Sequence, residues 1–205
     1  MKKNIYLTIS FIFLYIYYAV KKFEGGEMKK LVLLVVTAVV FMAGAAFAEG
    51  EINVKLGLDV AGEASYSRGG SVDINTGVNV QGEYLAVATD ILKAGGGLQY
   101  LLPRNQDGVS GDHGVSFLPI YATVEVNPIK PAKEVFFKAN LGYGLAIPEG
   151  DGDTESGLYY AIGAGYNFPF GLILDISYAW HTITSGDADF TYSKIGLNAG
   201  WKFKI

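Results

Sequence analysis

Residues 172–184 read LILDISYAWHTIT, a stretch in which every second side chain from Leu172 to Trp180 is large and apolar. Asp175 and Ser177 lie between these apolar side chains. A period of two residues predicts a β-strand with one apolar and one polar face. After residue 48 no apolar run is long enough for a membrane-spanning helix, so strands of this kind decide the fold.

The same alternation recurs along the rest of the chain, and no proposed apolar face carries a charge. Because lipid offers no hydrogen-bond partners to the backbone, only helices and closed barrels span it. We therefore predict one all-β domain over residues 49–205, an eight-stranded antiparallel up-and-down transmembrane β-barrel. The predicted strands are 52–67, 71–85, 90–102, 114–127, 134–147, 156–168, 171–184 and 191–204.

A soluble sandwich or lipocalin-like barrel is the alternative, because its strands alternate in the same way. Such a fold would point its apolar face inward and its charges to water. Glycine-rich opposite faces, a secretory signal and aromatic residues near the strand ends favour the membrane version. The predicted aromatic girdle consists of Tyr84, Tyr100, Tyr178, Trp180, Trp201 and Phe203.

Residues 28–48 have the three parts of a secretory signal peptide. A charged start at Lys29 and Lys30 precedes an apolar centre over residues 31–42 and a small-residue end. The predicted cleavage site comprises Ala46, Ala48 and Glu49, with cleavage after Ala48. An uncleaved membrane anchor is the alternative.

A second apolar run, residues 5–20, precedes this complete signal. We predict that residues 1–27 are a mis-called upstream extension and that translation starts at Met28. The four residues before Met28, EGGE, can be encoded by purine-rich codons that would form a ribosome-binding site. A genuine extended leader is the alternative.

The predicted mature chain is acidic. Removing residues 1–48 takes six Lys and two Glu from the 16 basic and 20 acidic residues, which leaves a net charge of about −8. Nucleic acid is therefore not an expected partner. The chain has no Cys, so the fold needs no disulfide bond.

Loop lengths predict the orientation, because bacterial barrels have short periplasmic turns and longer external loops. Residues 167–171 form a tight turn, whereas residues 103–113 and 148–155 are longer, polar and rich in glycine. We therefore expect both termini to be periplasmic.

The mature chain resembles the small eight-stranded outer-membrane barrels, the OmpA transmembrane domain, OmpX and OmpW-like group. The resemblance rests on segments 82–97, 159–166 and 200–205. It implies a bacterial outer-membrane location, a monomer, contact with lipid and lipopolysaccharide, and passage through the secretion and barrel-assembly machinery. The assembly signal would be read through Trp201 and Phe203, although the chain ends in Ile205 rather than an aromatic residue.

The inward faces carry nearly balanced charges, which must pair inside a narrow lumen. The predicted lumen network consists of Lys55, Asp59, Glu63, Glu83, Lys93, Glu125, Lys138, Asp175, Lys194 and Lys202. Hairpin counting and barrel closure predict that Glu83 lies near Lys93, Glu125 near Lys138, and Lys55 near Lys202. The network either fills the barrel as a plug or lines a narrow conduit, and inward glycines either leave a cavity or make room for neighbours.

The predicted loops contain few candidates for metal binding or catalysis. Asp151, Asp153 and Glu155 are a weak candidate for a calcium site, but the EF-hand glycine and bidentate glutamate are missing, so we expect a solvated loop and no cofactor. His113 lies in a loop, and His181 is expected at the barrel rim without a catalytic partner. An enzyme is not expected.

The sequence therefore predicts a structural outer-membrane barrel that displays short acidic loops. Two alternatives stay open: a narrow OmpW-like channel for small or apolar solutes, and a surface adhesin that acts through the loops.

Overall fold

The computed structural model describes residues 49–66, 69–104, 114–129, 132, 134–148, 154–185 and 188–205. The predicted upstream extension and the predicted signal peptide, with Ala46 and Ala48, lie outside these residues, and Glu49 begins them. No helix formed by the described residues is long and apolar enough to cross a membrane.

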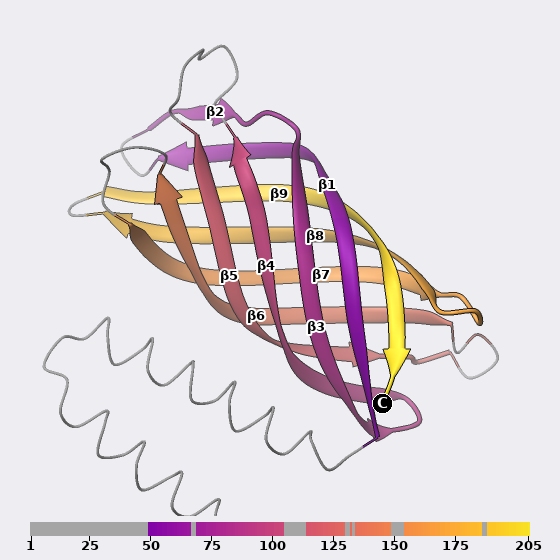
Figure 1. Ribbon diagram of the computed structural model, residues 1–205. Coiled ribbons are helices and arrows are strands. Elements are labelled where there is room, and N and C mark those ends of the chain that lie inside the picture. Colours follow the sequence, from indigo (N-terminus) through magenta and orange to yellow (C-terminus); the bar gives the residue numbers. More distant parts are fainter. Residues whose placement is uncertain are drawn as a thin grey trace, which may run out of the picture.

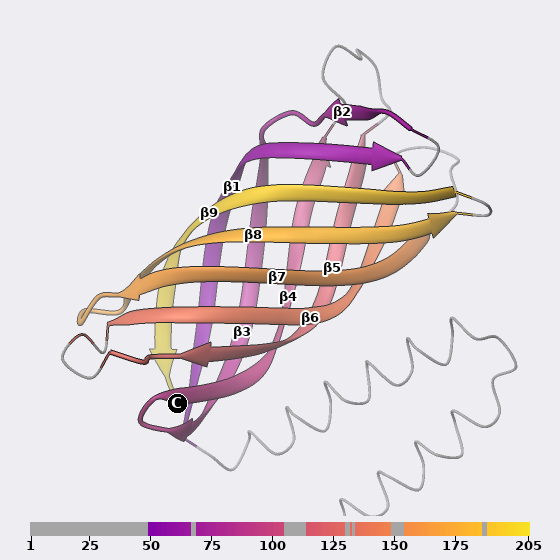
Figure 2. The same ribbon diagram turned by 180° about the vertical axis from the view of Figure 1, so that it is seen from behind.

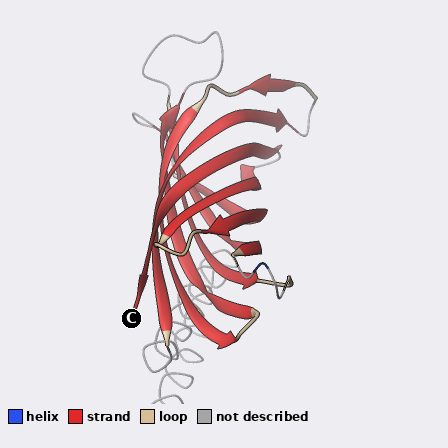
Figure 3. Cartoon of the chain, turned by 90° about the vertical axis from the view of Figure 1, so that its right-hand side faces the viewer, coloured by secondary structure: helices blue, strands red, loops and turns tan. Residues whose placement is uncertain are grey.

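The described strands form a closed antiparallel β-barrel, as predicted (Figures 1 and 2). Neighbours along the chain pair with one another, and β1 also pairs with β9, which closes the ring. Strands make up nearly all of the described chain (Figure 3). Their bounds are β1 Gly50–Tyr66, β2 Ser71–Asp73, β3 Gly77–Thr89, β4 Leu92–Arg104, β5 Val115–Val126, β6 Val135–Pro148, β7 Glu155–Asn167, β8 Leu172–Ser185 and β9 Ala188–Lys204.

The second predicted strand, 71–85, is two strands in the structure. The ladder between β1 and β3 ends where Asp59 lies opposite Gly77, and the short strand β2 pairs with the next part of β1. Eight strands therefore form the ring, and β2 is an additional strand beside β1 (Figure 1). The alternation within the predicted strand 71–85 puts Ile74 on the lipid-facing side, but in the structure Ile74 packs against a buried apolar cluster.

Apolar side chains face outward and polar side chains face inward. On β1 the exposed fractions of the even-numbered side chains are 38% for Ile52, 48% for Val54, 63% for Leu56 and 51% for Leu58. Asn53, Lys55 and Asp59, which alternate with them, are at most 2% exposed. A soluble barrel would show the opposite arrangement, so the exterior suits a lipid environment.

A β-bulge in β1 changes which residues reach the lumen. Asp59 lies opposite Gly196, but Ala61 lies opposite Ile195, so Val60 is an extra residue on β1. One extra residue reverses the alternation of side chains beyond it. The prediction was therefore wrong for Glu63, which is exposed, while the neighbouring Ala64 is buried.

Five of the predicted girdle residues lie at two levels of the barrel. Tyr84, Trp201 and Phe203 lie toward the strand ends that hold the termini, Tyr100 and Trp180 lie toward the opposite ends, and Tyr178 lies midway along β8. Leu172, which pairs with Trp201, is eight residues from Trp180. At about 3.3 Å per residue and a tilt of about 40°, this spacing is roughly 20 Å along the barrel axis. The spacing is close to the height of an apolar band in such barrels, about 25 Å.

The tight turn between β7 and β8 requires a glycine, and a substitution tests this requirement. Gly171 has a φ of +103°, and an added Cβ would lie 3.0 Å from Trp201 Nε1. We expect Gly171→Ala to lower the free energy of unfolding by about 1–2 kcal/mol, because side chains strain this backbone conformation. Urea unfolding of the refolded barrel in lipid vesicles measures the effect.

Gly82→Ala is the matched control, because nothing lies within 4 Å of an added Cβ there. We expect it to change the free energy of unfolding by less than about 0.5 kcal/mol. Equal effects of the two substitutions would contradict the account of the turn.

Candidate functional site: the charged lumen

Four buried charges meet in the middle of the lumen, and we call them the central quartet: Lys55, Glu83, Lys138 and Asp175. Lys55 Nζ lies 2.6 Å from Glu83 Oε2 and 2.9 Å from Asp175 Oδ2. Lys138 Nζ lies 3.1 Å from Asp175 Oδ1 and 3.9 Å from Glu83 Oε1. Each of the four side chains is at most 3% exposed. The two cations and two anions therefore compensate each other away from bulk water.

Glycines on neighbouring strands leave room for the Lys55 and Lys138 side chains to extend along the inner surface of the barrel. Lys55 pairs in register with Gly200 of β9, and Lys138 pairs with Gly163 of β7. An added Cβ would lie 2.5 Å from Lys55 Cγ at Gly200 and 3.2 Å from Lys138 Cε at Gly163. Each lysine side chain therefore extends over a glycine and reaches Asp175 on β8, one strand further around the barrel.

Neutral polar side chains complete the coordination of the quartet carboxylates. Asn198 Nδ2 donates to Asp175 Oδ1 at 2.6 Å, and the Tyr121 hydroxyl donates to Glu83 Oε1 at 3.1 Å. Gln81 Nε2 in turn donates to the Tyr121 oxygen at 2.6 Å. These bonds hold the carboxylates in one geometry, because a buried acceptor without a donor is costly.

A second cluster surrounds Asp59, nearer the end of the barrel opposite the termini, which we call the loop end. Lys194 Nζ lies 3.0 Å from Asp59 Oδ2, and Asn79 Nδ2 donates to Asp59 Oδ1 at 3.0 Å. Arg104 also donates to Asp59 Oδ2, and its second amino group donates to the Tyr192 hydroxyl at 2.8 Å. Asp59 thus binds two cations at once.

The sequence predicted Arg104 in an external loop, but the structure places its side chain in the lumen, 8% exposed. Strand β4 continues to Arg104, and its pairing with β5 shifts after Leu101, which turns the Arg104 side chain inward. The guanidinium lies over Gly77, where an added Cβ would be 2.4 Å from Arg104 Cζ.

A third cluster lies at the terminal end, the barrel end that holds Glu49 and Ile205. Lys93 Nζ lies 2.8 Å from Glu51 Oε2 and 2.8 Å from Glu125 Oε1. Lys202 lies 3.9 Å from Glu51 Oε1. Glu51 was missed because it precedes the first predicted strand.

The predicted lumen residues other than Glu63 enter these three clusters, but their partners differ from those predicted. Glu83 does not meet Lys93, because Glu83 is in register with Gly97 and Lys93 with Val87. Glu125 and Lys138 are register partners, yet each forms its ion pairs elsewhere. Lys55 binds Glu83 and Asp175 rather than approaching Lys202. Strand pairing alone does not fix partners, because long side chains reach across a neighbouring strand.

Apolar and aromatic side chains fill the lumen toward the loop end. The buried cluster there consists of Leu101, Phe117, Ala146, Ile183 and Tyr192. His181, predicted at the rim, is 1% exposed and packs between aromatic rings, with centroid distances of 4.8 Å to Tyr159 and 5.1 Å to Phe117. Neither of its ring nitrogens has a hydrogen-bond partner among the described residues. Burial in the lumen corrects the predicted rim position.

Inward glycines make room for neighbouring side chains rather than an open cavity. An added Cβ at Gly97 would lie 2.8 Å from the Tyr121 ring, and one at Gly165 would lie 2.4 Å from Phe136 Cζ. Gly57 is covered by the amides of Asn79 and Asn198. Of the two alternatives, these contacts favour packing.

The weak calcium candidate lies almost wholly outside the described residues. Asp151 and Asp153 are not described, and Glu155 begins β7. The residues that are described bring no three His, Cys, Asp or Glu side chains together in an arrangement that suits a metal ion. His113 also lies outside the described residues.

Comparison with known proteins places this barrel in a family. The family described as "Outer membrane protein beta-barrel domain" matches residues 31–203. The chain belongs to this family. The outer-membrane β-barrel family implies a location in the bacterial outer membrane, and it confirms the predicted class.

Solved structures agree on the fold of this outer-membrane barrel. The attachment invasion locus protein Ail of Yersinia pestis superposes with a TM-score of 0.52 at 15% identity, over 76% of this chain and 99% of that chain. Neisserial surface protein A also has a TM-score of 0.52, at 16% identity, over 75% of this chain and 97% of that chain. No curated protein matches the sequence.

A buried glutamate and an exposed glutamate allow a test of which side chains face the lumen. We expect Glu83→Gln to destabilise the outer-membrane barrel by about 3–5 kcal/mol, because it leaves Lys55 and Lys138 short of a buried counter-charge. Urea titration of the refolded protein in vesicles, followed by the folded band on unboiled gels, measures this change.

Glu63→Gln makes the same chemical change at an exposed position. We expect it to alter the free energy of unfolding by less than about 0.5 kcal/mol. A large effect at Glu63 and a small one at Glu83 would reverse the placement of these two side chains.

Proposed function

We propose that this outer-membrane barrel has a structural and surface-display role, with a lumen closed to ions. The observation that carries the proposal is the central quartet, whose four side chains are at most 3% exposed and bridge β1, β3, β6 and β8. An eight-stranded barrel is only wide enough for side chains to fill its interior. The quartet therefore occupies the cross-section through which an ion would pass.

The apolar cluster at the loop end supports the same proposal. Phe117 and Tyr192 stack with their ring centroids 5.2 Å apart, and His181 lies against both rings. An ion that enters from this end would lose part of its hydration against these rings, which is unfavourable.

A narrow conduit for small or apolar solutes is the second candidate, and one observation favours it. Side-chain amide oxygens along the lumen are buried without a hydrogen-bond partner among the described residues. They belong to Asn53, Asn79, Gln81, Gln99, Asn140 and Asn198. Buried polar atoms of this kind are commonly satisfied by internal water. A file of water molecules would give small solutes a wet path between the clusters.

Adhesion through the loops is a weaker candidate. The longer loops, over residues 105–113 and 149–153, lie outside the described residues. The attachment invasion locus protein of Yersinia pestis shares the fold at 15% identity, and this likeness shows the fold alone.

We also propose how the barrel is oriented in the outer membrane and which lipids surround it. We place both termini in the periplasm, because the two longest connections between strands of the ring, residues 67–76 and 105–114, lie at the end opposite the termini. The apolar exterior would contact outer-membrane lipid, and lipopolysaccharide on the loop side, in a monomer that has passed through the secretion and barrel-assembly machinery. No catalytic role is proposed.

Planar-bilayer conductance tests the closed lumen. The refolded barrel, residues 49–205, is expected to produce no single-channel steps, whereas a Lys55→Ala/Glu83→Ala/Lys138→Ala/Asp175→Ala variant that removes the quartet side chains is expected to conduct. Leu98→Ala, on the lipid-facing side and 54% exposed, is the silent control. Steps from the wild-type barrel that change in Glu83→Gln would instead establish the conduit.

The absence of cysteine from the chain allows a test of orientation. A membrane-impermeant maleimide is expected to label Asp107→Cys on intact cells and Pro169→Cys only after the outer membrane is permeabilised. The reverse pattern would place the termini outside the cell.

A further inference from the structure

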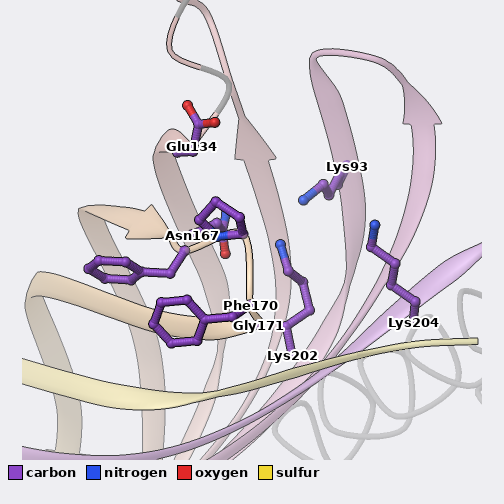
Figure 4. A pocket seen from close by; sticks show the side chains of 9 residues that line it. Lys93, Glu134, Asn167, Phe170, Gly171, Lys202 and Lys204 are labelled. Atoms are coloured by element: carbon purple, nitrogen blue, oxygen red, sulfur yellow. The ribbon is translucent and has the colours of Figure 1, made fainter.

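Three lysines converge at the terminal end on a pocket of about 540 Å³ (Figure 4). Lys202 and Lys204 come from the end of β9 and Lys93 from the start of β4. Lys202 and Lys204 are two residues apart on one strand, so they point to the same side of it. In Figure 4 the three ammonium groups turn toward the same space.

The close ion pairs at this end serve the three lysines unequally. Lys93 uses both of its close partners, Glu51 and Glu125, each at 2.8 Å. Among the described residues, Lys202 forms one ion pair, at 3.9 Å with the shared Glu51, which also lies opposite Lys204 in the register of β1 and β9. No carboxylate of the described residues lies within 4.0 Å of the Lys204 ammonium. Lys202 and Lys204 therefore share one carboxylate that Lys93 already holds at 2.8 Å, and the repulsion between the two cations falls when an anion lies between them.

Glu134 is the acidic side chain that lines the pocket, and it stands on the wall opposite the lysines (Figure 4). It leaves the space between Lys202 and Lys204 free for an oxygen-rich group. A tetrahedral oxyanion such as a phosphate offers enough acceptor oxygens to bind both ammonium groups at once.

The opposite rim of the pocket is apolar and reaches the lipid-facing surface. Phe168 and Phe170 pack with their ring centroids 5.4 Å apart, and Phe170 is 62% exposed. The Phe170 ring lies 6.0 Å from the ring of Trp201, which is 44% exposed on the exterior. A cationic centre beside exposed aromatic rings suits a ligand that carries a phosphate and an acyl chain.

We propose that this pocket binds the phosphate of an anionic phospholipid from the leaflet that surrounds the terminal end. Lys202 and Lys204 hold the phosphate, Lys93 adds a more distant positive charge, and the acyl chains lie against Phe170 and Trp201. The proposal depends on the barrel lying in a membrane and not on whether its lumen conducts. It holds for either orientation of the termini.

Trp201 can report occupancy because the chain has only two tryptophans. In a Trp180→Phe background, the refolded full barrel is placed in phosphatidylcholine vesicles that contain either brominated phosphatidylglycerol or brominated phosphatidylcholine. We expect brominated phosphatidylglycerol to quench Trp201 more strongly at equal mole fraction.

Substitution of the two lysines tests the assignment. In Lys202→Gln/Lys204→Gln the preference for phosphatidylglycerol is expected to fall by roughly five-fold for each lysine, as for charges beside an anionic leaflet. Glu134→Gln is the matched variant of opposite sign, and it is expected to strengthen the preference. Quenching by brominated phosphatidylcholine, and the folded band on unboiled gels, are expected to stay unchanged in all variants.

Equal quenching by the two brominated lipids in the wild-type background, or a preference that survives loss of both lysines, would overturn the proposal. Loss of the preference on addition of millimolar inorganic phosphate, with matched chloride as the ionic-strength control, would make free phosphate the ligand and overturn the lipid assignment. Persistence of the preference in phosphate would support the lipid.

Discussion

Most ion pairs of the central quartet join strands that are not hydrogen-bonded neighbours. The backbone ladder fixes each strand to the next, β1 to β3 included, but only side chains connect β1 to β8, β6 to β8 and β3 to β6. Burial makes these pairs a strict constraint, because removal of one charge leaves its partners uncompensated away from water. The glycines beside Lys55 and Lys138, the amide of Asn198 and the hydroxyl of Tyr121 all serve this arrangement. The closed lumen that we propose depends on it.

The barrel, its closure and its lipid-facing side could be predicted from the sequence because they follow from one period. Residues such as Leu56 and Leu174 repeat every second position without a charge, and an apolar face of that kind is stable only against lipid or a core. The inward position of Lys55, Asp59 and Asp175 follows from the same alternation. A local pattern therefore determines the global architecture.

The errors lie where that period is interrupted. The extra residue at Val60 turns Glu63 outward, and the register shift after Leu101 turns Arg104 inward. Pro103 marks the second interruption, because proline within a strand is confined to edges and bulges, whereas no comparable residue type marks the first. Ion-pair partners were mispredicted for a different reason: Lys138 is in register with Glu125, but it crosses Gly163 to reach Asp175. Lysine opposite glycine on the next strand was a usable signal, once the register was known.

A double-mutant cycle between Lys55 and Asp175 tests the central claim most directly. The free energies of unfolding of Lys55→Met, Asp175→Asn and the double variant would be compared in lipid vesicles. If the two charges are buried and paired as described, the double variant is less destabilised than the sum of the single variants by about 1 kcal/mol or more. Additive effects within about 0.5 kcal/mol would mean that the charges do not interact and would contradict a lumen closed by their pairing.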